Sequence, residues 1–130
     1  MNKLLGLLLA LVLLAGCTTG GDTADGAGAG YTQITQAEAA EIMASETGYV
    51  ILDVRSQAEY DGGHIPGAIC IPHDTIRGDV PELPDKSQRI LVYCRSGNRS
   101  KAASEALSQA GYTNVLEFGG INTWTGEIEK

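Results

Sequence analysis

The stretch Ile90-Leu91-Val92-Tyr93-Cys94-Arg95-Ser96-Gly97-Asn98-Arg99 leads from an apolar strand into a polar loop and then into a helix. Its first four residues are apolar or aromatic, as in a strand that is covered on both faces. After the loop, four apolar residues recur at the spacing of one helix face: Ala103, Ala106, Leu107 and Ala110. Gly111 follows where a helix commonly ends. This order of elements predicts a parallel α/β sheet.

The rest of the chain repeats this alternation of strands and helices. Residues 50–54 are a second apolar run, interrupted only by Asp53, and shorter strands are expected at residues 68–71 and 115–116. Two capping boxes, Thr35 with Glu38 and Ser56 with Glu59, predict the starts of two helices. A last helical segment is expected around Trp124. The predicted fold is one α/β domain with a parallel central sheet and helices on both faces.

Composition excludes some classes of partner. The chain has 130 residues, 43% of them hydrophobic, which is enough for one packed domain. Its formal net charge is −7, and Lys and Arg form no run. This argues against nucleic-acid binding, which needs clustered cations against phosphate. It also argues against adhesion to an anionic membrane by charge alone.

The N-terminus is typical of an export signal. Residues 4–15 are an apolar run broken only by Gly6. That run is shorter than the roughly 17–25 residues that span a bilayer, but it suits the core of a secretory signal. Residues 1–16 are therefore expected to be a signal peptide. The polar, glycine-rich segment that follows has little to bury, so residues 17–30 are expected to be a tether and residues 31–130 the domain.

The end of this signal, Leu14-Ala15-Gly16-Cys17, resembles the lipobox of prokaryotic lipoproteins. The resemblance implies cleavage before Cys17 and lipidation of Cys17, which would anchor the domain outside the cytoplasm to the cell membrane or the outer membrane. Thr18 stands where an Asp would signal retention in the inner membrane. An ordinary signal peptide with a chance cysteine remains the alternative.

Cys94 is the candidate nucleophile. In α/β sheets the functional site lies beyond the carboxyl ends of the strands, and Cys94 follows such an end. The backbone N–H groups of the loop, the start of the next helix and the charges of Arg95 and Arg99 all favour a thiolate, so its pKa should fall below about 8.5. Gly97 allows a tight turn, and Asn98 tolerates unusual dihedral angles. A buried structural thiol is the alternative.

Four separate pieces of the chain, in order, resemble the single-domain rhodaneses (sulfurtransferases). They are Leu52-Asp53-Val54-Arg55 with Glu59-Tyr60, Gly63-His64-Ile65-Pro66-Gly67-Ala68, Cys94-Arg95-Ser96-Gly97-Asn98-Arg99-Ser100, and Gly119-Gly120 with Trp124. The resemblance implies that Cys94 takes a sulfane sulfur from a donor such as thiosulfate and passes it to a thiol or cyanide. It also implies that the loop binds the donor through Arg95, Ser96, Gly97, Asn98 and Arg99, and that no metal or organic cofactor is required.

Several other residues have expected roles beside Cys94. Arg99 is favoured as the contact for the anionic donor because it ends the loop. Asp53 and Arg55 are expected to be mainly architectural, with Asp53 accepting bonds from backbone or an Arg and Arg55 pairing with Glu59. His64 is expected to make a positioning hydrogen bond, and His73 is a candidate for the pocket rim.

Cys70 stands where many relatives carry a polar residue. It is interpreted as a packing residue. The alternative is that it resolves the persulfide or forms a disulfide with Cys94, which requires Cα atoms within about 7 Å.

Two other functions compete with sulfur transfer. Cys-based phosphatases place five residues between Cys and Arg, whereas four separate Cys94 from Arg99, so a phosphatase is disfavoured. A non-enzymatic persulfide carrier or redox-sensing module that docks to a protein would use the same residues. The expected partners are a small anionic sulfur donor, a thiol acceptor that a protein could supply, and a membrane through the lipid anchor.

Overall fold

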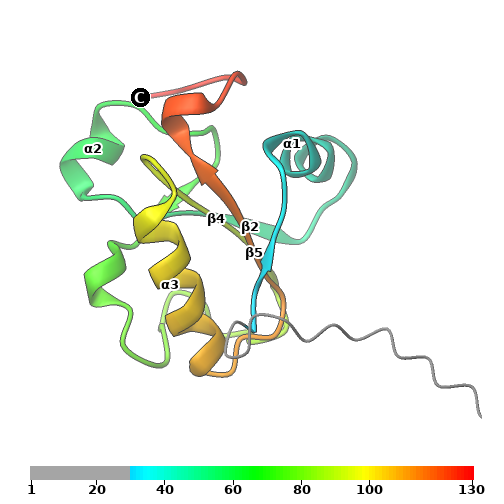
Figure 1. The fold of residues 1–130 in the computed structure, drawn as a ribbon, viewed down its shortest axis with the longest axis vertical. Coiled ribbons are helices and arrows are strands. Elements are labelled where there is room, and N and C mark those ends of the chain that lie inside the picture. Colours follow the sequence, from blue (N-terminus) through cyan, green and yellow to red (C-terminus); the bar gives the residue numbers. More distant parts are fainter. Residues whose placement is uncertain (1–29) are drawn as a thin grey trace, which may run out of the picture.

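The computed structural model describes residues 30–130 and is built around one five-stranded sheet (Figure 1). The strand order is β1-β5-β4-β2-β3, and every neighbouring pair is parallel. The strands are β1 (Thr32–Gln33), β2 (Tyr49–Asp53), β3 (Ile69–Cys70), β4 (Arg89–Cys94) and β5 (Val115–Gly120). The prediction of a parallel α/β sheet is confirmed.

Helices lie on both sides of this sheet, as predicted (Figure 1). Helix α1 (Gln36–Ser45) covers one face, and α3 (Asn98–Gln109) covers the other. The short helix α2 (Gln57–Asp61) lies near the start of α3. Two 3-10 turns complete the fold: η1 (His73–Thr75) and η2 (Ile121–Thr123).

The helix boundaries follow the local signals in the sequence. Both capping boxes are formed, with Thr35 accepting from the Glu38 N–H and Ser56 accepting from the Glu59 N–H. These bonds satisfy N–H groups that have no partner inside the helix. Gly111 follows the last turn of α3 with φ of +100°, the conformation expected of a glycine that ends a helix.

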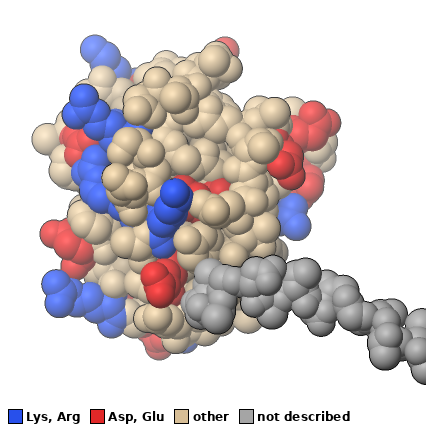
Figure 2. Space-filling model, viewed as in Figure 1, with Lys and Arg blue, Asp and Glu red and all other residues tan. Residues whose placement is uncertain are grey.

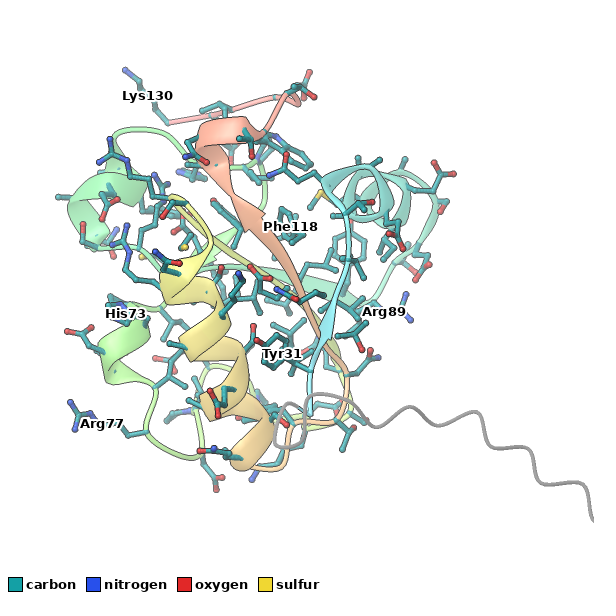
Figure 3. The ribbon with its side chains drawn as sticks, viewed as in Figure 1. Tyr31, His73, Arg77, Arg89, Phe118 and Lys130 are labelled. Carbon is teal, nitrogen blue, oxygen red and sulfur yellow. The ribbon has the colours of Figure 1, made fainter. Side chains whose placement is uncertain are left out.

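Alternate residues of β4 enter two separate hydrophobic clusters. Leu91 and Tyr93 pack on the α1 side together with Phe118, which Figure 3 shows between the sheet and α1. Cys94 points to the opposite face, into the cluster that contains Leu107 of α3. The pleat of the strand therefore places the Cys94 thiol against α3.

Some boundaries differ from the expectation. Cys94 is the last residue of β4 rather than the first residue after it, and β5 extends well past residues 115–116 to Gly120. The expected helical segment near Trp124 is a single 3-10 turn that ends at Thr123.

The expected signal peptide (1–16), Cys17 and all of the tether before Gly30 lie outside the described residues. A search for helices long and apolar enough to cross a membrane found none in the part of the chain that the structure describes.

Candidate active site around Cys94

The Cys94 thiol lies at the bottom of the loop between β4 and α3. The residue is 0% exposed, and its Sγ accepts a hydrogen bond from the Gly97 N–H at 3.0 Å. Sγ also lies 3.4 Å from the Ser100 hydroxyl. Gly97 has φ of +103°, a left-handed conformation that glycine adopts without strain, and this turn aims its N–H at the sulfur.

The surroundings of Cys94 favour its thiolate. Burial alone would raise the pKa of this thiol. A hydrogen bond with the Ser100 side chain and hydrogen bonds from the backbone N–H groups of Ser100, Gly97 and Ser96 act in the opposite direction, and the net effect is a lowered pKa. Cys94 is therefore buried, as a structural cysteine would be, but several donors are oriented toward its sulfur.

The end of β5 forms one wall of the Cys94 loop. A Cβ atom on Gly120 would lie 2.1 Å from the Arg95 carbonyl oxygen and 2.7 Å from the Ser96 Cα. The same carbonyl accepts a hydrogen bond from the Asn122 N–H at 3.1 Å. Gly120 thus allows a backbone approach that no other residue would permit.

Arg95 and Arg99 lie on different sides of the loop. Arg95 is exposed and lines a cavity of about 320 Å³ with Arg55 and Asn122. Arg99 lines a second cavity of about 380 Å³ together with His73, so His73 lies beside a cavity that the last residue of the loop also lines.

The guanidinium of Arg99 is already paired. It donates to the two carboxylate oxygens of Glu59 at 2.7 and 3.0 Å. The bond to Arg99 is the main cause that lowers the pKa of Glu59 to about 2. Within residues 30–130 the Arg95 guanidinium forms no hydrogen bond, so it is more available than Arg99 to bind an incoming anion.

Charge is unevenly distributed on the face shown in Figure 2. Most of the Lys and Arg side chains visible there lie on the side of α2 and α3, where the Cys94 loop is. The opposite side, around α1, shows mainly acidic side chains. The chain is acidic overall, but the exposed cations on this face lie mostly on the side of the Cys94 loop.

Asp53 and Arg55 form a buried hydrogen-bond network that links β2, β4 and the turn at residues 63–65. Arg55 donates to both oxygens of Asp53, at 2.7 to 3.1 Å, and to the carbonyl of Gly63 at 2.7 Å. The Tyr93 hydroxyl donates to Asp53 at 2.7 Å and accepts from the Ile65 N–H at 3.1 Å. The expected architectural role of Asp53 and its pairing with an Arg are therefore confirmed.

The predicted pairing of Arg55 with Glu59 is wrong. Helix α2 begins after Ser56, so Arg55 precedes the helix and does not share a helical face with Glu59. Glu59 instead contacts Arg99, which is distant in sequence.

His64 makes the positioning contacts that were expected. Its Nδ1 lies 2.9 Å from the Tyr60 carbonyl oxygen, and its Nε2 lies 3.2 Å from a carboxylate oxygen of Glu129. Its ring stacks on Tyr60 with centroids 3.7 Å apart. These contacts fix the turn at residues 63–65 and tie it to the end of the chain.

Cys70 cannot pair with Cys94 in this fold. The register aligns Cys70 and Tyr93 with Asp53 on opposite edges of β2, so two strand spacings, roughly 10 Å, separate β3 from β4. Cys70 also shares the face of Tyr93, whereas Cys94 points to the other face. Both cysteines are free, and Cys70 is half-buried with a raised pKa, mainly because of burial.

Two features of the site differ from or go beyond the sequence analysis. Asn98 is the first residue of α3, so it lies in regular helix and the fold does not use its tolerance of unusual dihedral angles. Glu117 of β5 was not foreseen: it is buried and accepts a hydrogen bond from Ser100 at 2.6 Å. The strand was expected to end at residue 116, so nothing in the sequence indicated that Glu117 is a buried strand residue at the site.

Comparisons with known proteins agree with this geometry. A family model described as Rhodanese-like domain matches residues 35–127. The chain is 39% identical over 71 residues to the thiosulfate sulfurtransferase PspE of Escherichia coli, which covers 54% of this chain and 68% of that protein. It is 36% identical over 80 residues to the putative sulfur carrier protein YrkF of Bacillus subtilis, covering 61% and 43%.

Other similar proteins extend this picture. A rhodanese-related protein from Thermoplasma volcanium superimposes with a TM-score of 0.65 and 33% identity, over 76% of this chain and 98% of that one. The adenylyltransferase and sulfurtransferase UBA4 of Meyerozyma guilliermondii is 35% identical over 91 residues, or 63% of this chain. The chain spans only 21% of UBA4, so some curated relatives are several times longer than the shared domain.

Proposed function

Since the chain belongs to the rhodanese-like domain family, we propose that it moves a sulfane sulfur from a thiosulfate-like donor to a thiol or cyanide through a persulfide on Cys94. The observation that carries this proposal is the Cys94 Sγ at the carboxyl end of β4, with the Gly97 N–H at 3.0 Å and a lowered pKa. A sulfur nucleophile needs this setting. The name of PspE supports thiosulfate as the donor.

In the first half-reaction the Cys94 thiolate attacks the outer sulfur of thiosulfate. A bond forms between Sγ and that sulfur, the original S–S bond breaks, and sulfite leaves with the bonding electron pair. The product is a persulfide that carries the negative charge on its terminal sulfur. Loop N–H groups stabilise this charge as they would an oxyanion.

In the second half-reaction an acceptor thiolate or cyanide attacks the terminal sulfur. The new bond takes that sulfur to the acceptor, and Cys94 leaves as the thiolate with which the cycle began. Splitting the transfer into two steps through one nucleophile predicts ping-pong kinetics. Neither step needs a metal or an organic cofactor.

The donor is a dianion, and the loop offers it two cations. Arg95 is the more accessible because Arg99 is engaged by Glu59. Arg99 contributes its charge from the adjacent cavity, and the backbone of Ser96, Gly97 and Asn98 shapes the space between the two arginines. A short loop of this kind suits a small sulfur anion better than a tetrahedral phosphate.

A thiosulfate:cyanide assay on the full chain, with Cys94→Ser beside it, tests this proposal. The wild type should produce thiocyanate with ping-pong kinetics, and Cys94→Ser should not. Absence of turnover in the wild type would contradict an enzymatic role.

The second candidate is a persulfide carrier that hands its sulfur to a protein, and the name of YrkF favours it. A carrier would accept sulfur on Cys94 and show negligible turnover with cyanide or small thiols. Persulfide formation without steady-state turnover would therefore select this role over the enzyme.

The lipobox-like sequence extends the proposal to location. Cys17 carries the lipid, and the domain acts outside the cytoplasm on a short tether. Mass spectrometry of the mature N-terminus should find a Cys17 that carries lipid on its thiol and its amine in the membrane fraction, and Cys17→Ser should remove the protein from that fraction. An unlipidated mature chain would leave the ordinary signal peptide as the explanation.

A further inference from the structure

Glu117 is a buried carboxylate behind the Cys94 loop that the proposed reaction does not yet use. It is 2% exposed, in the middle of β5. Its Oε1 accepts from the Ser100 hydroxyl at 2.6 Å and from the Gly119 N–H at 2.9 Å, and its Oε2 accepts from the Gln33 amide at 3.2 Å. Among residues 30–130 it forms no ion pair with a Lys, Arg or His. A buried carboxylate without a cation is costly, so its place next to the site calls for a reason.

Ser100 lies between Glu117 and the Cys94 thiol. Its hydroxyl oxygen is 2.6 Å from Glu117 and 3.4 Å from the Cys94 Sγ, and the carbonyls of Gly97 and Gly119 lie at 3.0 and 3.4 Å. A serine hydroxyl has a single proton to donate. An ionised Glu117 and a Cys94 thiolate therefore compete for it, and the shorter distance favours Glu117.

We propose that Glu117 is a positioning residue for sulfur transfer that acts through Ser100: when ionised, it holds the Ser100 proton and so biases Cys94 toward the thiol. This inference rests on the proposed use of Cys94 as the sulfur nucleophile. With the proton held by Glu117, Ser100 offers the sulfur a lone pair, which accepts from S–H. When Cys94 ionises, its S–H bond breaks, the proton leaves to water, and the Ser100 O–H turns from Glu117 to the thiolate.

The titratable groups near Glu117 do not neutralise its charge. From α3, Glu105 adds negative charge, and from the segment before β1, Tyr31 has a pKa that is raised by burial and by the charges of Glu117 and Glu105. Arg99, near the start of α3, interacts with the Cys94 charge but is paired to Glu59. Within the described part of the chain, no Lys, Arg or His forms an ion pair with Glu117, so its carboxylate and the Cys94 thiolate repel each other.

The effect of Glu117 on Cys94, which opposes that of the loop N–H groups, is useful for sulfur transfer. The loop N–H groups lower the pKa of Cys94, but a thiolate of very low pKa is a poorer nucleophile, and the most effective attacking thiol has a pKa near the ambient pH. Glu117 moves Cys94 back toward that optimum. It also makes thiol formation easier after the sulfur has left, which protects an extracytoplasmic cysteine from oxidation between cycles.

Titration of the Cys94 thiolate in the full chain tests the proposal without any sulfur donor. The ultraviolet absorbance of the thiolate is followed against pH, and the signal of the matching Cys94→Ser variant is subtracted so that Cys17 and Cys70 do not contribute. Glu117→Gln should shift the Cys94 titration to lower pH by roughly one to two units, the scale of two like charges that lie two hydrogen bonds apart in a partly buried site. No shift, or a shift to higher pH, would overturn the proposal.

The role of the Ser100 hydroxyl between Glu117 and Cys94 is tested by combining variants. In a Ser100→Ala background, Glu117→Gln should produce a smaller shift, because the shared proton is gone and only charge repulsion remains. The matched control is Ser104→Ala: Ser104 is buried one turn further along α3, and its hydroxyl has no hydrogen-bond partner within residues 30–130. That change should leave the titration where it is. An equal Glu117→Gln shift with and without Ser100 would contradict the relay through the hydroxyl.

A measurement on the wild-type sequence covers the case in which Glu117→Gln fails to fold. With ¹³C-labelled glutamate, the Glu117 carboxyl resonance should move at the pH at which Cys94 ionises, and this step should vanish in Cys94→Ser. A resonance that does not respond to Cys94 would contradict the proposal. None of these readouts uses a sulfur donor or acceptor, so a failure of sulfur transfer would leave them unchanged and the two outcomes can be told apart.

Discussion

Gly120→Ala is a small change that tests whether the end of β5 sets the geometry of the Cys94 loop. The added Cβ would lie 2.1 Å from the Arg95 carbonyl oxygen, whereas real Cβ atoms essentially never approach closer than 3.0 Å. Gly120 has φ of −128° and ψ of 151°, which alanine adopts freely. The effect is therefore purely steric, and either the loop or the strand must move by about 1 Å.

A displacement of this size should be costly for chemistry. A misplacement of about 1 Å at a reacting centre lowers the rate roughly 100-fold, and overpacking costs about 1–3 kcal/mol of folding free energy. We expect Gly120→Ala to remain folded, to lose about two orders of magnitude in the rate of persulfide formation from thiosulfate, and to melt at a lower temperature. Single-turnover sulfite release and calorimetry measure the two effects.

Gly62→Ala is the matched control. Gly62 has φ of −77°, and a Cβ there would meet its nearest atom, the Glu59 carbonyl oxygen, at an ordinary 3.4 Å. It should leave the rate and the melting temperature nearly unchanged. Wild-type kinetics in Gly120→Ala would refute the idea that the backbone contact positions the nucleophile.

Three further predictions concern the groups around the loop. The pKa of Glu59 is lowered from 4.5 to about 2, so its pairing with Arg99 stabilises the fold above pH 4.5, and this contribution is lost as the pH falls through about 2. Because both side chains are about 30% exposed, we expect roughly 1 kcal/mol, measured as the pH-dependent difference in urea stability between wild type and Glu59→Gln. Tyr93→Phe leaves the buried Ile65 N–H without its acceptor and should cost about 1–3 kcal/mol in the same assay; an unchanged stability would contradict the network. Arg95→Ala should raise the KM for thiosulfate several-fold with little change in kcat, and more than Arg99→Ala does; the reverse order would favour Arg99 as the anion contact.

Much of the fold could be predicted because its signals are local. The capping serine and threonine, the apolar runs of β2 and β4 and the glycine after α3 each act on their own neighbours, and each prediction agrees with the structure. Strand β1 has only two residues and is held by pairing with β5, so nothing in its own sequence marks it. The extension of β5 also depends on pairing, since Gly120 pairs with Cys94.

The site could be predicted in its centre but not in its surroundings. Cys94 and Gly97 are recognisable because a nucleophile in an N–H-lined loop needs a cysteine and a tight turn next to each other in sequence. Arg99 pairs with Glu59, and Ser100 pairs with Glu117. Both pairs are distant in sequence and meet only because α3 packs against the rest of the domain. The four-residue spacing predicted that Glu59 pairs with Arg55. No sequence pattern indicates that Glu117 lies beside the Cys94 thiol.

The mass of the Cys94-containing peptide after exposure of the full chain to thiosulfate tests the central claim most directly. Digestion without reductant, followed by mass spectrometry, should show one additional sulfur atom on Cys94. Cyanide or a thiol should remove this sulfur, and Cys70 should not acquire it. An unmodified Cys94 under these conditions, in a folded protein, would contradict the account of Cys94 as a sulfur-carrying nucleophile.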